Sequence, residues 1–201
     1  MRDRREILAL LASVCAMPAL AQQSPSPATP AQVVSPQMSR PTAYAFSFKR
    51  LEGVDLRLAG HAGKPILVVN TASLCGYTPQ YTGLQQLWTR FRDQGLLVIG
   101  VPSNDFGGQE PGGAADIDHT AHQKYGVTFP LAEKVTVKGA AAHPFYKWAA
   151  GERPLDPPRW NFHKYLVGRD GHITAAFSSE IEPLDARLVA AVAKELRLPA
   201  S

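Results

Sequence analysis

Two short, almost uninterrupted runs of apolar residues stand out in the middle of the chain. The first runs from Ile66 to Thr71 and the second from Leu96 to Pro102. Apolar runs of this length, without polar alternation, are typical of strands that are buried on both faces of a sheet. A helical pattern between them ends at Gly95 and places apolar residues on one face: Tyr81, Leu84, Leu87, Trp88 and Phe91. Strand, helix and second buried strand together predict a right-handed βαβ unit with parallel strands.

Shorter patterns before and after this unit predict the rest of one globular domain. Further strands are expected at residues 45–49, 54–58, 164–167 and 172–177, and further helices at residues 114–125, 143–150 and from Pro183 onward. The turn Gly168-Arg169-Asp170-Gly171 contains an Asp-Gly pair, which is a strong hairpin signal. The order of elements predicts an α/β protein with a thioredoxin-like fold, in which a central mixed sheet has helices on both faces and an N-terminal β-hairpin precedes it.

A cysteine lies where the first buried strand gives way to the helix. Thr78 and Pro79 are expected to be the N-cap and the first residue of that helix, so Cys75 stands just before its N-terminus. Unpaired backbone N–H groups and the positive end of the helix dipole favour the thiolate form there, as a nucleophile requires. A small buried hydrophobic residue is the alternative, because free cysteines often have only that role. Position alone leaves both interpretations open.

The first 41 residues differ in composition from the remainder. Three arginines (Arg2, Arg4 and Arg5) precede an apolar run from Ile7 to Val14, and Ala19-Leu20-Ala21 has the small-x-small pattern of a signal-peptidase site. Because the run is too short to span a bilayer, we expect a signal peptide over residues 1–21 that is cleaved near Ala21, no stable membrane anchor, and an exported protein, periplasmic or secreted. Residues 22–41, rich in Pro, Ser and Gln, are expected to form a disordered tether, and residues 42–201 the globular domain.

Charge and cysteine content narrow the possible functions. Loss of the leader would remove three arginines and two acidic residues, which lowers the net charge from +4 to +3. This mild excess comes without a dense Lys/Arg run, so a nucleic-acid partner is not expected. Of the two cysteines, Cys15 would leave with the leader, and Cys75 would remain as a free thiol that cannot form an internal disulfide.

Four short motifs are spread along the predicted domain. They are Asn70-Thr-Ala-Ser-Leu-Cys-Gly-Tyr-Thr-Pro-Gln-Tyr81, Asn104-Asp-Phe-Gly-Gly-Gln-Glu-Pro111, Tyr125-Gly-Val-Thr-Phe-Pro130 and Trp160-Asn-Phe162. Together, and in this order, they resemble the glutathione peroxidase family, and the resemblance extends from about Tyr44 to Leu196. It implies a thiol-dependent enzyme that reduces hydrogen peroxide or organic hydroperoxides and takes part in the response to oxidative stress.

The resemblance also implies a set of catalytic residues. Cys75 stands at the position of the peroxidatic residue, with Gln109, Trp160 and Asn161 beside it. Attack of sulfur on an O–O bond needs a thiolate, and neutral amide and indole N–H donors stabilise that charge and the leaving hydroxide. The sulfenic acid that forms must then be reduced by a thiol. By residue type alone, Gln109 would be a polar turn residue, Trp160 a core aromatic and Asn161 a loop residue.

The chain departs from the family pattern in ways that bear on the reductant. Residues 114–125, where cysteine-containing members often carry a resolving cysteine, contain none, and Ser103 and Asp105 replace a common cysteine and glutamine. Intramolecular resolution is therefore not expected. The resemblance implies no cofactor but an external thiol reductant, either glutathione or a thioredoxin-like protein. The segment between Tyr146 and Trp160 lacks the long oligomerisation loop of some members, which implies a monomer.

Two other functions and a metal site are alternatives to the peroxidase. A thiol–disulfide oxidoreductase is disfavoured because Thr78 stands where the second cysteine of a Cys-x-x-Cys pair would be. An exported redox sensor that relays oxidation from Cys75 to a partner protein fits the absence of a resolving cysteine. His119 and His122 have a spacing that can bind a metal, but no cysteine or acidic residue completes a site convincingly, so no metal is assigned.

Overall fold

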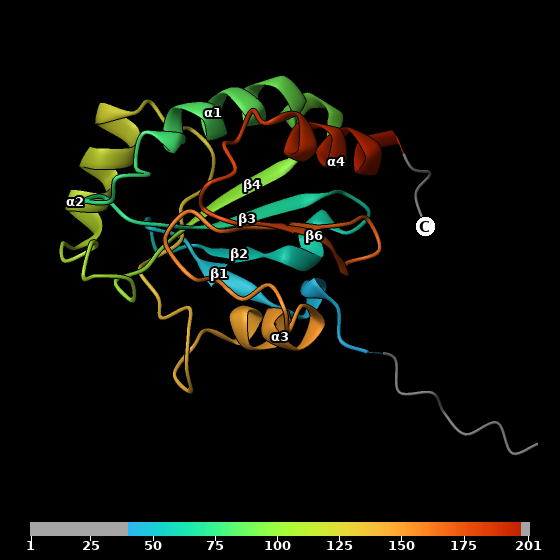
Figure 1. Ribbon diagram of the computed structural model, residues 1–201, viewed down its shortest axis with the longest axis horizontal. Coiled ribbons are helices and arrows are strands. Elements are labelled where there is room, and N and C mark those ends of the chain that lie inside the picture. The colour runs from blue at the N-terminus through green and yellow to red at the C-terminus, as the bar shows by residue number, and fades with distance from the viewer. Residues whose placement is uncertain (1–39, 198–201) are drawn as a thin grey trace, which may run out of the picture. The chain divides into compact units, whose positions relative to one another are not determined.

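The computed structural model describes residues 40–197 (Figure 1). The predicted signal peptide, residues 1–21, lies outside the described residues, as does the predicted tether, residues 22–41, apart from its last two positions. Across residues 40–197, no helix combines the length and the apolar character that crossing a membrane requires.

The centre of the fold is a four-stranded sheet in the order β4-β3-β5-β6. Its strands are β3 (Ile66–Thr71), β4 (Leu97–Pro102), β5 (Lys164–Val167) and β6 (Ile173–Phe177). β3 pairs in parallel with β4 and antiparallel with β5, and β5 pairs antiparallel with β6. The sheet is therefore mixed, as predicted, and the parallel pair is the predicted βαβ unit.

A small antiparallel sheet precedes the central one, which confirms the predicted N-terminal hairpin. It consists of β1 (Ser47–Lys49) and β2 (Asp55–Arg57), with Phe48 opposite Leu56. A single bridge joins Arg50 to Ala132, and another joins Gly100 of β4 to Leu131. The hairpin is thus connected to the segment that follows β4.

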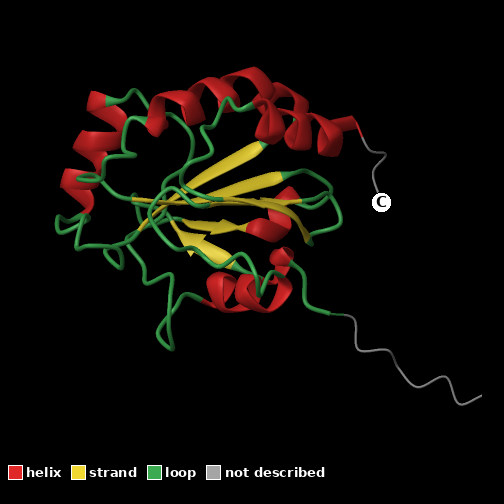
Figure 2. Ribbon diagram, in the orientation of Figure 1, coloured by secondary structure: helices red, strands yellow, loops and turns green. Residues whose placement is uncertain are grey.

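Helices cover both faces of the central sheet, as predicted (Figure 1, Figure 2). α1 (Gln80–Phe91) and α4 (Ala186–Arg197) lie over one face, and α3 (Pro144–Glu152) lies on the other side with the hairpin. α2 (Ala114–Asp118) continues into a π-helix over His119–Lys124 and lies beyond one end of the sheet. Short 3₁₀ helices span Ala43–Ala45, Leu58–His61 and Arg92–Gln94.

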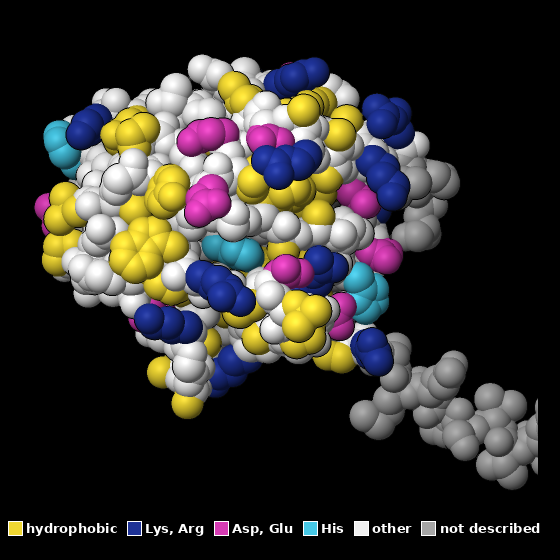
Figure 3. All heavy atoms as spheres, in the orientation of Figure 1, with side chains coloured by type: hydrophobic (Ala, Val, Ile, Leu, Met, Phe, Trp, Pro, Cys, Tyr) yellow, Lys and Arg dark blue, Asp and Glu magenta, His cyan; other side chains and the backbone are white. Residues whose placement is uncertain are grey.

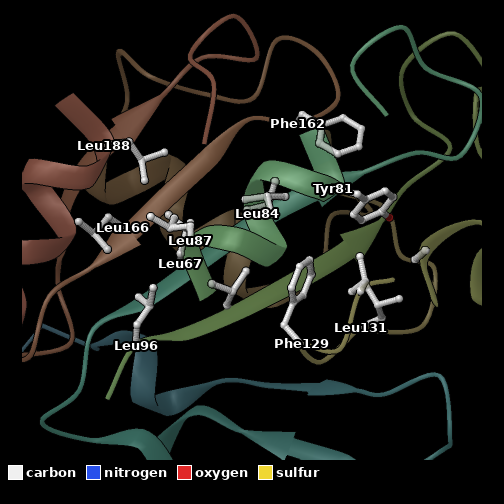
Figure 4. Packing of buried hydrophobic residues seen from close by; sticks show 14 of the residues in the cluster. Leu67, Tyr81, Leu84, Leu87, Leu96, Phe129, Leu131, Phe162, Leu166 and Leu188 are labelled. Atoms are coloured by element: carbon white, nitrogen blue, oxygen red, sulfur yellow. The ribbon is translucent and has the colours of Figure 1, made fainter. Parts of the chain in front are cut away.

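Alternate residues of β3 contribute to two hydrophobic cores, one on each face of the sheet. Leu67 and Val69 belong to the core that includes residues of α1 and α4. Ile66 and Val68 belong to the core that includes residues of α3 and the hairpin. Figure 4 shows the first core, with labelled residues that include Leu67, Leu84, Leu87, Leu166 and Leu188. Every residue of β3 is buried, as the almost uninterrupted apolar run predicts.

Charged side chains of both signs are interspersed on the face drawn in Figure 3. Arg153 pairs with Asp156 at 2.8 Å and Arg187 with Asp185 at 2.7 Å, so these ion pairs join residues close in sequence. Partly exposed pairs of this kind contribute little to stability, because water screens them and the side chains lose freedom. The fold depends mainly on the two cores.

The last helix begins later than the sequence predicts. The expected start was Pro183, but α4 begins at Ala186. The Asp185 carboxylate accepts a hydrogen bond from the Arg187 backbone N–H at 2.8 Å, and the Val189 N–H bonds to the Asp185 carbonyl at 3.0 Å. Asp185 therefore acts as the N-cap, and Pro183 stays in the preceding turn. The hydrogen bond with the Arg187 side chain lowers the pKa of Asp185 to about 2.

The helix expected over residues 114–125 is also different. The α-helical part covers Ala114–Asp118, and the following π-helix runs over His119–Lys124. The Tyr125 N–H bonds to the Thr120 carbonyl, five residues earlier, at 3.2 Å. Gly126, with φ of 64°, ends the element as predicted. Apolar spacing alone does not distinguish the two helix types over so few residues, because their turns differ by less than one residue.

Gly100 in β4 provides a test of core packing. A Cβ atom there would overlap the Leu131 side chain and lie 3.4 Å from the Phe129 ring. We expect Gly100→Ala to lower the free energy of unfolding by about 1–3 kcal/mol, because both neighbours are buried and the core is overpacked. Urea denaturation measures the change. Gly60→Ala is the control, since no atom lies within 4 Å of a Cβ at Gly60; equal stability of the two variants would contradict the prediction.

Candidate functional site

Cys75 lies in a turn between β3 and α1. The chain leaves β3 at Thr71 and reaches the helix only at Gln80. In between, the Thr78 N–H bonds to the Cys75 carbonyl at 3.0 Å and the Gln80 N–H to the Tyr77 carbonyl at 2.9 Å. These tight turns lead into the helix. Pro79 precedes its first residue, and no side chain makes a capping hydrogen bond there. The prediction that Thr78 caps the helix is therefore wrong.

Thr78 instead holds the turn that contains the cysteine. Its hydroxyl, in a side chain that is almost fully buried, accepts a hydrogen bond from the Cys75 backbone N–H at 3.1 Å. The same hydroxyl lies 2.9 Å from the Ala72 carbonyl and 2.7 Å from the Cys75 carbonyl, and it donates to one of the two. A helix N-cap would use the same hydroxyl oxygen to accept a hydrogen bond from an N–H of the first turn of α1, but here that oxygen accepts from the Cys75 N–H instead.

The cysteine is nearly buried but has a polar contact at its sulfur. Cys75 is 7% exposed and borders the core beneath α1. The Tyr77 backbone N–H donates to Sγ at 3.4 Å. Leu74, the residue before it, is 67% exposed, so the turn itself lies at the surface. Within residues 40–197, Cys75 is the one free cysteine. An N–H directed at sulfur favours the nucleophile over the purely hydrophobic interpretation.

Gln109 and Asn161, which are predicted site residues, are brought together by the fold. The side-chain amide of Asn161 donates to Oε1 of Gln109 at 3.0 Å and lies 3.4 Å from the Phe106 carbonyl. The backbone carbonyl of Gln109 accepts a hydrogen bond from the Leu74 N–H at 3.0 Å. Gln109 therefore joins the buried Asn161 to the residue that precedes Cys75. Since the side-chain oxygen of Gln109 accepts the bond from Asn161, the side-chain NH₂ group of Gln109 remains as a donor.

Trp160, the fourth predicted residue, lies at the surface of the same region. It is 40% exposed, and its ring packs against Phe106 with 6.0 Å between centroids. With Tyr77, whose N–H reaches the sulfur, it lines a groove of about 420 Å³. The other lining residues are Arg159, Ser178, Ser179 and Glu180. The groove therefore lies next to Tyr77, two residues after Cys75, and Cys75 itself is not in its lining. The catalytic roles of Cys75 and its three partners stay predictions.

A buried polar cluster at the start of α1 was not predicted. The Lys164 ammonium is fully buried and donates to Oε1 of Gln80 at 2.5 Å and to the Ile181 carbonyl at 2.6 Å. Gln80 also donates to the Ser179 carbonyl at 2.7 Å. The cluster therefore fixes the first residue of α1 to β5 and to the segment that lines the groove. A lysine that opens an apolar strand was the available signal in the sequence.

Burial also shifts the ionisation of groups close to the site. It raises the pKa of Glu110, the residue after Gln109, while hydrogen bonds with Ser73 and the charge of Lys134 act in the opposite direction. It lowers the pKa of Lys164 to about 7, although the nearby Glu182 carboxylate opposes this shift. Both groups therefore have less tendency to be charged than they would in water.

The two histidines of the predicted helix make contacts with their own segment. His119 Nδ1 lies 3.0 Å from Gln123 Oε1, and His122 Nδ1 lies 2.6 Å from an Asp118 oxygen. The hydrogen bond with His122 lowers the pKa of Asp118. Across the part of the chain that the structure describes, no group of three or more His, Cys, Asp or Glu side chains is placed to hold a metal ion.

Comparisons with known proteins agree with these features. Residues 43–150 match the family described as glutathione peroxidase. A hydroperoxy fatty acid reductase of Synechocystis sp. is 45% identical over 151 residues, which are 71% of this chain and 89% of that protein. The crystal structure of Trgpx in apo form has a TM-score of 0.66 and 32% identity, and the match covers 81% of this chain and 100% of that one.

A more distant structure identifies the fold class. A thioredoxin-family thiol:disulfide interchange protein of Chlorobium tepidum TLS is 15% identical, with a TM-score of 0.57. The match covers 75% of this chain and 92% of that chain. At this identity the likeness concerns the fold alone, and it confirms the predicted thioredoxin-like architecture.

The Thr78 hydroxyl generates a prediction about the turn. We expect Thr78→Val, which preserves shape, to lower the free energy of unfolding by about 1–3 kcal/mol, because the Cys75 N–H and a buried carbonyl lose their partner. Chemical denaturation measures the change. Thr82→Val, at an exposed position of α1, is the matched control. An unchanged stability of Thr78→Val relative to this control would show that the hydroxyl does not hold the turn.

The lowered pKa of Lys164 predicts that the stability of the protein increases with pH. In the folded protein its pKa is lowered to about 7, whereas the unfolded chain keeps the ordinary value of 10.5. Between these values the unfolded state binds more protons, so the free energy of unfolding rises with pH. Relative to Lys164→Met, the wild type should gain at least about 1 kcal/mol between pH 7 and pH 10 in denaturation experiments. The stability of Lys49→Met, a variant at an exposed position, should vary with pH as that of the wild type does. A stability difference between the wild type and Lys164→Met that does not change with pH would contradict the lowered pKa of Lys164.

Proposed function

The chain belongs to the glutathione peroxidase family and is therefore a thiol-dependent peroxidase, and from that premise we propose that peroxide oxidises Cys75. The proposal depends on one observation above all. Gln109 bonds through its side chain to Asn161 and through its backbone to the residue before Cys75. Two amide side chains that are 52 residues apart in sequence thus meet beside the cysteine turn.

The reaction begins with attack of the Cys75 thiolate on the nearer oxygen of the peroxide. An S–O bond forms, the O–O bond breaks, and the leaving oxygen departs as water or an alcohol after it takes up a proton. The sulfur is oxidised by two electrons and becomes a sulfenic acid. Amide N–H groups of Gln109 and the indole N–H of Trp160 donate to the peroxide and to the leaving oxygen, where negative charge develops.

External thiols complete the cycle. A first thiol forms a mixed disulfide with Cys75 and releases water, and a second thiol displaces the restored cysteine and leaves as a disulfide. The sequence contains one other cysteine, Cys15, in the predicted leader, so the mature chain would have no resolving cysteine of its own. The reductant is accordingly a small thiol such as glutathione, or a thioredoxin-like protein, that reaches Cys75 along the groove beside Trp160.

The peroxide substrates include organic hydroperoxides as well as hydrogen peroxide. The relative from Synechocystis sp. is named a hydroperoxy fatty acid reductase. In this chain the groove next to Tyr77 also has the aromatic side chain of Trp160 in its lining, which suits an organic substituent.

Export, a monomeric state and a role against oxidative stress are part of the same proposal. Export rests on the basic and apolar pattern of residues 1–21 and on Ala19-Leu20-Ala21. The monomer rests on the short segment between Tyr146 and Trp160. Removal of peroxide outside the cytoplasm would protect the envelope from oxidation.

A panel of reductants tests the function directly. Purified wild type should consume peroxide with at least one thiol, and Cys75→Ser, which keeps the shape of the side chain, should fall to the uncatalysed rate. Asn161→Ala leaves Cys75 in place but should lower the rate of peroxide reduction about 100-fold, because the Gln109 side chain loses the hydrogen bond that orients its NH₂ donor. Peroxide consumption is followed with each reductant at fixed peroxide.

Two results would contradict the proposal. The first is a wild-type rate in Cys75→Ser, which would mean that sulfur is not the nucleophile. The second is a wild type that is inactive with every small thiol and with thioredoxin. Trapping of a stable mixed disulfide between Cys75 and another protein, in place of turnover, would favour the sensor function instead.

A further inference from the structure

Asn70 is a buried polar residue within β3, and it is hydrogen-bonded to the segment that contains Trp160. Its side-chain Nδ2 donates to the Trp160 carbonyl at 3.0 Å. Its backbone carbonyl accepts from the Phe162 N–H at 2.5 Å, and its backbone N–H donates to the His163 carbonyl at 3.3 Å. Any residue other than proline could make the two backbone bonds. Only the bond to Trp160 depends on the asparagine side chain.

The backbone between these bonds is strained. Phe162 has φ of +63°, and it is the one non-glycine residue with positive φ among residues 40–197. Its side chain is fully buried, so glycine is no substitute at this position. A bulky residue adopts this conformation only where the surroundings enforce it. Asn70 contacts the chain on both sides of Asn161, at Trp160 and at Phe162, and so restrains the strained turn.

The side chain of Asn70 also lowers the stability of the fold. Its Oδ1 atom is buried and has no hydrogen-bond partner in the described part of the chain. A buried acceptor without a partner lowers stability, and an isosteric leucine would remove that cost in the strand. The asparagine side chain is therefore better explained by its bond to the Trp160 carbonyl than by a contribution to stability.

We propose that Asn70 is a positioning residue for the peroxidase reaction: its amide fixes the Trp160 carbonyl and so directs Trp160 and Asn161 toward the Cys75 turn. This inference rests on the proposed function. β3 leads directly into the Cys75 turn, so the bond couples the strand that places the sulfur to the segment that supplies the donors. A small rotation at Trp160 would displace the Asn161 amide from Gln109 and the indole from the groove.

The test is Asn70→Leu, studied in the two halves of the catalytic cycle. Steady-state rates are measured with varied peroxide at fixed thiol and with varied thiol at fixed peroxide. The second-order rate constant for peroxide should fall about tenfold, the rate equivalent of one buried hydrogen bond, while that for the thiol stays within about twofold. A purely structural defect would reduce the amount of active enzyme and lower both constants by the same factor.

Two further comparisons isolate the mechanism. Thr71→Val removes a buried hydroxyl from the next residue of β3 and should leave both rate constants unchanged. In an Asn161→Ala background, Asn70→Leu should have little further effect on the peroxide constant, because the two residues act through the same segment. Asn70→Ser, whose hydroxyl is too short to reach the Trp160 carbonyl, should reproduce the selective loss if the leucine variant does not fold.

Three outcomes would overturn the inference. They are an unchanged peroxide constant in a folded Asn70 variant, an equal loss in both half-reactions, or additive effects of Asn70→Leu and Asn161→Ala. Failure of the proposed function is distinguishable from these, because it would show as full activity of Cys75→Ser or as no activity of the wild type.

Discussion

The double burial of β3 is the constraint on which the site depends. The strand is hydrogen-bonded to β4 on one side and to β5 on the other, and its alternate residues enter two different cores. A shift of one residue would exchange these sets of side chains between the cores, so its register is strongly specified. The position of its last residue is therefore fixed. Cys75 follows four residues later, and the turn held by Thr78 fixes its place relative to the end of the strand.

The other parts of the site are assembled around this strand by polar contacts. Gln109 reaches the turn through the Leu74 N–H, and Asn161 reaches Gln109. Asn70, within the strand, holds the backbone at Trp160. Residues from three distant segments thus meet beside the cysteine turn. Neutral donors suit this chemistry, because they stabilise developing negative charge at oxygen without competing for a proton.

Much of the fold could be predicted because its strongest signals are local. The apolar run from Ile66 to Thr71 is a strand over those residues, and the Asp-Gly turn at 170–171 lies between β5 and β6. The errors occurred where a side chain has two possible backbone partners. The Thr78 hydroxyl bonds to the Cys75 turn and does not cap α1, and Asp185 caps α4 two residues after the expected start at Pro183.

The site was predictable only in part. Motif order predicts Gln109 and Asn161 as site residues, but their mutual hydrogen bond depends on how residues 52 positions apart are folded together. Asn70 and Lys164 were missed as contributors, because a single polar residue in an apolar strand gives no indication of its partner. Their partners, the Trp160 carbonyl and Gln80, lie 90 and 84 residues away in sequence.

Mass spectrometry of the protein after one equivalent of peroxide, without any thiol, tests the central claim most directly. The account predicts one added oxygen on Cys75, which a sulfenic acid-specific reagent traps and a thiol reverses. An unmodified Cys75 in protein that has consumed the peroxide would contradict it.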